Sequence, residues 1–100
     1  MINKNEIKQS MTYLITVSKS IYGDKNIVEE RILSNIDILL AYSKKNADCM
    51  GHELIFEIRN IISNVSRQLN SEEKIILEKE LTPLIEFFKV MKLQLPQDLY

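Results

Sequence analysis

Apolar side chains recur every three or four residues along four segments of this chain, and a turn signal separates each segment from the next. This spacing places the apolar side chains of each segment on one face of an α-helix. Glycine and proline are scarce, with two of each, which favours long helices over the many tight turns of an all-β fold. We therefore expect helices at about 5–22, 26–45, 51–69 and 71–92, and a short irregular tail at 93–100.

The signals between these segments are those of helix ends and helix starts. Gly23 follows the first segment, where a residue able to take a positive φ closes a helix. Residues 46–51 form a weaker second break. Asn70 and Ser71, followed by two glutamates, are typical of a helix start, because the polar side chains accept bonds from the free amides and the glutamates meet the positive helix end.

The expected buried positions follow from the same spacing. In the first segment they are Ile7, Met11, Leu14, Ile15, Ser18 and Ile21. In the second they are Val28, Ile32, Ile36, Leu39 and Ser43, widened by Leu33 and Leu40. In the third they are Leu54, Ile58, Ile61, Ile62, Val65 and Leu69, with Ile55 at the margin, and in the fourth Leu77, Leu81, Leu84, Ile85, Phe88 and Met91.

Pro83 interrupts the last of these helices. Proline removes one backbone hydrogen bond and clashes with the preceding turn, at a cost of about 3 kcal/mol. We therefore expect either a kink at Thr82–Pro83 or a new helix that starts with Thr82 as its cap.

Short linkers make successive helices run antiparallel, and four amphipathic faces of similar length bury one another around a common axis. The expected fold class is all-α: an antiparallel up-down-up-down four-helix bundle with its last helix kinked near Pro83. A chain of 100 residues is the size of one domain, so we assign 1–100 to a single bundle.

The charge and the cysteine content limit the classes of function. The formal net charge is -1, so no basic field exists to hold nucleic acid. The lone Cys49 cannot form an internal disulfide and the start of the chain lacks the apolar core of a secretion signal, which favours a reducing cytoplasm. Apolar runs fall well short of the roughly 20 residues of a membrane-spanning helix, so any membrane contact is expected to be peripheral.

The residues that could carry chemistry are few. Cys49 and His52 are three residues apart, but a structural zinc normally needs four protein ligands, and no group is present to orient a nucleophile and its base. We expect no metal and no cofactor. A small helical enzyme of the chorismate mutase type would use arginines inside the bundle, for which the candidates are Arg31, Arg59 and Arg67 with Lys44 and Glu57. Arg59 and Arg67 fall opposite the apolar face, where they reach solvent.

Two features exceed what a minimal bundle requires. In the last segment Ile76, Pro83, Phe87 and Val90 form a second apolar stripe beside the core stripe, and Phe56 stands on the polar side of the third helix. One interpretation is that the tail residues Leu95, Leu99 and Tyr100 fold back over the stripe and that one exposed Phe is ordinary. The other is that Phe56, Phe87, Val90, Leu95, Leu99 and Tyr100 receive a partner.

The order of these elements resembles the immunity proteins of pediocin-like (class IIa) bacteriocins, in particular the enterocin A immunity family of lactic acid bacteria and streptococci. The resemblance runs through the Ile-rich segment at 27–45, the Leu54 to Leu69 helix, the Asn70-Ser71-Glu72-Glu73 start, the leucine-rich helix that follows and the short tail. It covers most of the chain.

The resemblance implies a cytosolic four-helix bundle that protects the cell producing a pore-forming peptide. It implies binding at the inner membrane face to the mannose permease receptor once the bacteriocin has engaged it, and it associates the C-terminal half with the choice of bacteriocin. The family has no catalytic residues to transfer. The alternatives are another interaction module, such as an antitoxin or a phage-encoded adaptor, and the small helical enzyme described above.

Overall fold

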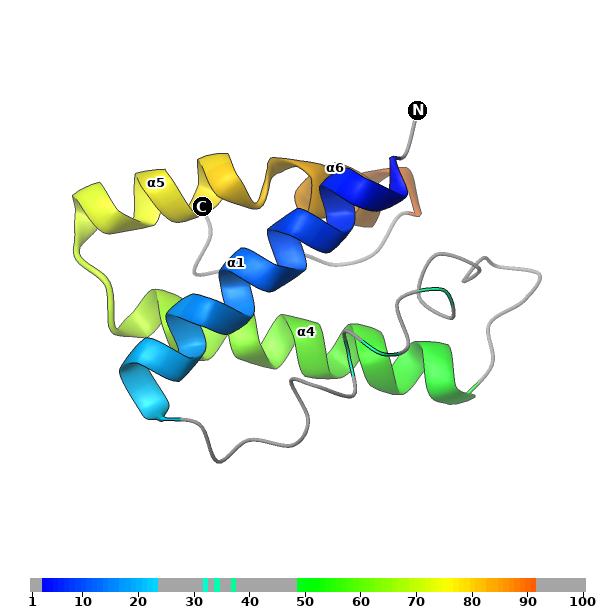
Figure 1. Cartoon of the computed structure of the whole chain (residues 1–100), viewed down its shortest axis with the longest axis horizontal. Coiled ribbons are helices and arrows are strands. Elements are labelled where there is room, and N and C mark those ends of the chain that lie inside the picture. The colour runs from blue at the N-terminus through cyan, green and yellow to red at the C-terminus, as the bar shows by residue number, and fades with distance from the viewer. Residues whose placement is uncertain (1–2, 24–31, 33, 35–36, 38–48, 92–100) are drawn as a thin grey trace.

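The computed structural model describes residues 3–23, 32, 34, 37 and 49–91, with the backbone alone described at 49–52 (Figure 1). Within these ranges the elements are four α-helices and no strands: α1 (Lys4–Tyr22), α4 (Cys49–Arg67), α5 (Ser71–Glu80) and α6 (Thr82–Val90). The all-α fold class expected from the sequence is therefore confirmed. The helix expected at 26–45 lies outside the described residues, apart from Ile32, Ser34 and Asp37, whose backbone is helical.

Helix α1 is closed at both ends by local hydrogen bonds. The side chain of Asn3 accepts bonds from the backbone N–H groups of Asn5 and Glu6, at 2.9 and 3.3 Å, which satisfies two amides that lack a partner within the helix. At the other end Gly23 has φ 88° and donates its N–H to the Lys19 carbonyl at 2.8 Å. The predicted stop at Gly23 is confirmed, and its cause is the positive φ that a residue with a Cβ rarely adopts.

Helix α5 begins where the sequence predicts a helix start. Asn70 Oδ1 accepts the Glu73 N–H at 2.8 Å, while Glu73 Oε1 accepts the Asn70 N–H at 3.0 Å. This reciprocal pair satisfies two amides at once and fixes the direction in which the chain leaves α4. Helix α4 ends at Arg67, two residues earlier than predicted, because Gln68 and Leu69 bond to carbonyls three residues back and tighten the turn.

The helix expected at 71–92 is divided into α5 and α6 at Leu81. Pro83 stands in the first turn of α6, where the N–H that proline lacks is not needed for the helix. The expected cap is wrong, because Leu81 occupies the N-cap position and the Thr82 hydroxyl donates back to the Glu78 carbonyl at 3.1 Å. The buried Leu81 side chain holds the junction in the core.

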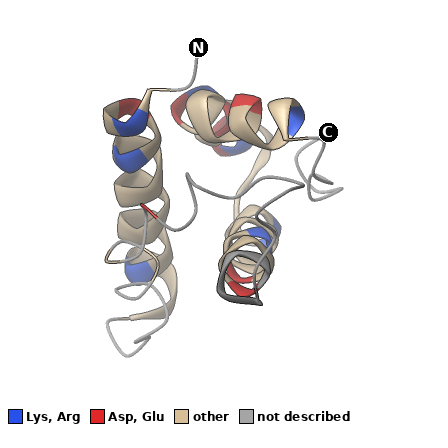
Figure 2. Ribbon diagram, turned by 90° about the vertical axis from the view of Figure 1, so that its right-hand side faces the viewer, with Lys and Arg blue, Asp and Glu red and all other residues tan. Residues whose placement is uncertain are grey.

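Helix α1 packs against each of the other three helices. Figure 1 shows it crossing diagonally in front of α4 and the α5–α6 pair, and Figure 2 shows it along one side of the molecule with those helices on the other. In Figure 1 α1 and α4 run in the same general direction, while α5 runs back along α4. The up-down-up-down order as a whole remains a prediction, because its second helix falls outside the described residues.

The core consists of aliphatic and aromatic side chains. Its buried members are Ile7, Met11, Leu14, Ile15, Ile32, Leu54, Ile55, Ile58, Ile61, Ile62, Val65, Leu77, Leu81, Leu84, Phe87 and Phe88. Ile21, Leu69, Ile85 and Met91, which were expected in the core, are partly buried against it. The periodicity of α1 and α4 therefore predicted their buried faces well. Ile55, expected at the margin, is fully inside.

Three serines are the buried polar residues in this part of the chain: Ser10, Ser18 and Ser66. The Ser10 hydroxyl donates to the carbonyl of Glu80 at 2.9 Å, and so joins α1 to the last residue of α5. Carbonyls in the last turn of a helix lack helical partners. Ser10 therefore stabilises the place where α5 ends. Ser66 differs, because its buried Oγ has no hydrogen-bond partner among the described groups.

The two serines give opposite predictions for a change of nearly equal size. We expect Ser10→Ala to lower the free energy of unfolding by about 1 kcal/mol, because the Glu80 carbonyl loses a part-buried hydrogen bond. We expect Ser66→Ala to leave that free energy unchanged or to raise it slightly, because it removes a hydroxyl that is buried without a bond. Urea unfolding of both variants beside the parent chain measures the difference. Equal losses of unfolding free energy in the two variants would contradict a stabilising bond at Ser10 and none at Ser66.

Candidate functional site

Among the described residues, five large apolar or aromatic side chains are more than half exposed. They are Tyr22 (53%) on α1, Phe56 (60%) on α4, Ile75 (67%) and Ile76 (53%) on α5, and Val90 (63%) on α6. Four of the five belong to the C-terminal half of the chain. The fifth, Tyr22, has a structural bond, since its hydroxyl donates to the Asn64 carbonyl at 2.7 Å and ties the end of α1 to α4.

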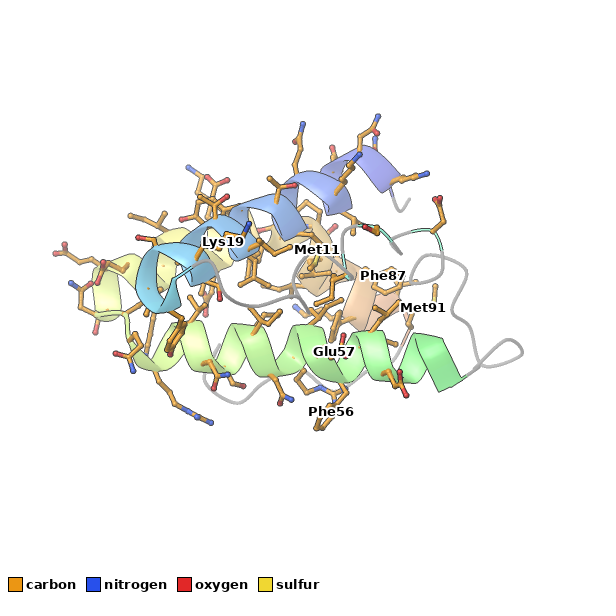
Figure 3. All side chains as sticks on the ribbon, turned by 60° about the horizontal axis from the view of Figure 1, so that its bottom comes forward. Met11, Lys19, Phe56, Glu57, Phe87 and Met91 are labelled. Carbon is orange, nitrogen blue, oxygen red and sulfur yellow. The ribbon has the colours of Figure 1, made fainter. Side chains whose placement is uncertain are left out.

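Phe56 lies on the side of α4 that faces away from α1. Figure 3 shows its ring pointing outward, whereas Met11 and Phe87 lie between the helices. Its neighbours one turn away are polar, with Glu53 and Asn60 exposed and Arg59 half-buried. The position expected from the sequence is therefore the observed one. The ring is a single apolar group in a polar surface, available for a partner to cover.

Phe87 corrects the sequence-based interpretation. It was expected on a surface stripe and assigned to partner binding, but it is fully buried and packs edge-to-face on Phe88, with ring centroids 6.3 Å apart. Phe87 follows the buried Leu84 by three residues, so the two side chains share a helix face. Leu84, Phe87 and Phe88 are the buried residues of α6.

The rest of the second stripe is accessible. Ile76 and Val90 are exposed and Pro83 is half-buried. Ile75 was missed from the sequence, although it is the most exposed large apolar residue of the described chain. The sequence did contain a signal, because Ile75, Ile76 and Leu77 are consecutive and successive helical residues point about 100° apart. Only Leu77 of the three is buried.

Several candidate residues lie outside the described part of the structure. They are the tail residues Leu95, Leu99 and Tyr100, the cationic candidates Arg31 and Lys44, and the side chains of Cys49 and His52. The proposed roles of these residues stay predictions.

The remaining candidates for an enzyme site do not meet in the core. Arg59 and Glu57 are half-buried on α4, and Arg67 is exposed, with its guanidinium 3.5 Å from the Asn64 side-chain oxygen. No charged residue is fully buried in the described core, although the Oε2 atom of Glu57 is buried. Among the described residues no three His, Cys, Asp or Glu side chains are grouped so that they could hold a metal ion.

Helix α1 contributes a different kind of surface. Its exposed side chains between Asn3 and Ser20 are polar, and four of them line an open depression: Asn5, Lys8, Gln9 and Thr12. One lysine and three neutral groups on a single helix face provide weak recognition. The apolar surface of α4, α5 and α6 is the stronger candidate for binding.

Comparisons of the chain with protein-family models, with curated proteins and with solved structures find no match. No helix in the described ranges combines the length and the apolar character needed to cross a membrane.

The revised position of Phe87 gives a direct test. We expect Phe87→Ala to lower the free energy of unfolding by about 3 to 5 kcal/mol, because it opens a cavity in the core. The matched change Val90→Ala, at an exposed site of the same helix, should cost less than about 0.5 kcal/mol. Thermal or urea unfolding of both variants provides the measurement. If the Phe87→Ala protein is as stable as the Val90→Ala protein, the assignment of Phe87 to the core is wrong.

Proposed function

We propose that this chain is an immunity protein that protects a cell from a pore-forming, pediocin-like bacteriocin. It acts by binding and not by catalysis, and its partner is the receptor complex formed by the mannose permease with bound bacteriocin. The chain acts from the cytoplasmic side, where it is peripheral to the inner membrane face. The identity of this partner rests on the resemblance of the sequence to the enterocin A immunity family.

The single observation that supports this proposal best is the distribution of exposed apolar side chains. Phe56, Ile75, Ile76 and Val90 lie on α4, α5 and α6, whereas the exposed side chains of α1 before its last turn are polar. The resemblance associates the C-terminal half with the choice of bacteriocin. Within the described residues, the surplus apolar surface thus lies mainly in the half of the chain where recognition is expected.

The physical basis for binding is the removal of this surface from water. Apolar burial contributes about 25 cal/mol per Å² at an interface, and a few large side chains usually supply most of the affinity. An aromatic ring in a polar surrounding, such as that of Phe56, is the kind of anchor that interfaces favour. Because such residues contribute little to folding, they can be exchanged without loss of the bundle.

The proposal predicts protection of a sensitive strain. Expression of the chain should raise the concentration of at least one pediocin-like peptide needed to inhibit growth. Phe56→Ser and Val90→Ser should each reduce that protection by roughly tenfold, since loss of an anchor costs on the order of 1 to 2 kcal/mol of binding. Tyr100→Ala tests the tail in the same assay. Gln9→Ala on α1 is the matched control and should protect as well as the parent chain.

Two results would count against the proposal. Unchanged sensitivity across a broad panel of pediocin-like peptides, with the chain expressed and folded, would remove the immunity function. Full protection by Phe56→Ser and Val90→Ser together would remove the assigned surface while leaving the function in place.

A further inference from the structure

We infer that the Ile75–Ile76 pair on α5, together with the glutamates around it, is a docking surface for a cationic amphipathic helix. This inference deepens the proposed binding function and rests on it, since it defines the chemistry of a partner segment. We call this surface the α5 patch and define it as Ile75 and Ile76 with Glu72, Glu73, Glu78 and Glu80.

The apolar centre of the patch is exposed for a structural reason. Helix α5 offers three consecutive apolar residues and buries only Leu77, while Leu81 beyond its end completes the contact with the core. The packing of α5 thus leaves both isoleucines outward, at 67% and 53% exposure. An adjacent pair of exposed β-branched side chains contributes nothing to helix propensity and costs solubility. A partner that covers the pair removes that cost.

The surroundings of the pair are acidic. In a helix the residues three and four positions away are surface neighbours. Glu72 precedes both isoleucines by one turn, Glu78 follows Ile75 by three residues, and Glu80 follows Ile76 by four. Glu73 is also a neighbour of Ile76, although its carboxylate already bonds to the Asn70 N–H.

The two lysines of α5 offset only part of the negative charge of its four glutamates. The helix contains four glutamates and two lysines, a formal charge of 2 − 4 = −2, while the whole chain has a net charge of -1. Lys74 lies toward the core side and is half-buried. Lys79 is exposed and follows Ile75 by four residues and Ile76 by three, so it borders the patch beside the glutamates, and within the described residues no ion pair joins it to Glu72, Glu78 or Glu80. Figure 2 shows both red and blue segments on the helices at the top of the view.

The apolar centre and the acidic rim of the α5 patch together favour a positively charged partner over the other molecules that could cover it. A second copy of the chain in a two-fold contact would bring the glutamate rim against itself. A membrane surface containing anionic lipids would be repelled in the same way. The chain's own residues 92–100 contain one lysine and one aspartate, and so have no net positive charge to offer. A helix with aliphatic residues on one stripe and lysines beside it satisfies both the apolar centre and the acidic rim.

The test measures binding by the purified full chain. The probe is a synthetic helix of about 18 residues, long enough to fold on contact, with leucines at helical spacing and lysines elsewhere. The matched control peptide has glutamate at every lysine position. We expect the lysine peptide to bind at least tenfold more tightly than the glutamate peptide, with an affinity that falls as salt is added.

Variants of the chain localise the binding. Ile75→Ser with Ile76→Ser should weaken the lysine peptide at least tenfold, whereas Ile75→Leu with Ile76→Leu should retain binding because the patch stays apolar. Glu80→Lys should also weaken it, and Glu86→Lys, an exposed glutamate on α6 outside the patch, should weaken it much less. Because both isoleucines are exposed, all these variants should keep the unfolding temperature of the parent chain, which thermal unfolding checks.

Four outcomes would overturn the inference. The first two are equal binding of the lysine and glutamate peptides, and equal effects of Glu80→Lys and Glu86→Lys on binding of the lysine peptide. The third is a dimer of the parent chain that dissociates in the serine variant, Ile75→Ser with Ile76→Ser. The fourth is adsorption of the parent chain to anionic lipid vesicles that the serine variant abolishes. The protection assay separates this inference from the proposed function. If the parent chain and the serine variant protect cells equally, the docking role of the α5 patch is wrong and the proposed immunity function is retained. If the parent chain binds the lysine peptide through the patch but protects no strain, the patch stands and immunity fails.

Discussion

The burial of one face of α1 against α4, α5 and α6 is the contact on which the rest of the described structure depends. Its stripe of Ile7, Met11, Leu14 and Ile15 is removed from water by three different helices. Tyr22 and Ser10 then add hydrogen bonds to α4 and to the end of α5. Apolar burial supplies the driving force, while these two directional bonds specify where along α1 each partner helix lies.

The junction at Leu81 divides the C-terminal helical segment into α5 and α6, and the two helices bury different side chains. Leu77 is the buried residue of α5, whereas Leu84, Phe87 and Phe88 are those of α6, and Ile75 and Ile76 are exposed. Pro83 makes a continuous helix costly, and Ser10 accommodates a carbonyl that the break releases. The junction thereby separates the helix with the exposed isoleucines from the helix that buries Phe87.

Local patterns in the sequence predicted the elements whose causes are local. The buried faces of α1 and α4 follow from spacing, the end of α1 from Gly23, and the start of α5 from the Asn70–Glu73 pair. Phe87 was misjudged because it lies at the edge of the apolar stripe, where tertiary packing decides burial, whereas Ile75 was missed although the run Ile75-Ile76-Leu77 contained the signal. Phe56 was placed correctly, because the side of a helix opposite a clear apolar face is exposed to solvent. The Ser10 bond spans 70 residues in the sequence, and no local pattern reveals such a pairing.

The separation of buried and exposed apolar positions within α5 has an evolutionary consequence. Leu77 connects the helix to the core, whereas the two isoleucines beside it make no comparable contribution to the interior. Natural selection can therefore alter the outward positions in a lineage, one substitution at a time, without passing through unfolded intermediates. A chain of this design can acquire new specificities quickly while its scaffold is inherited unchanged.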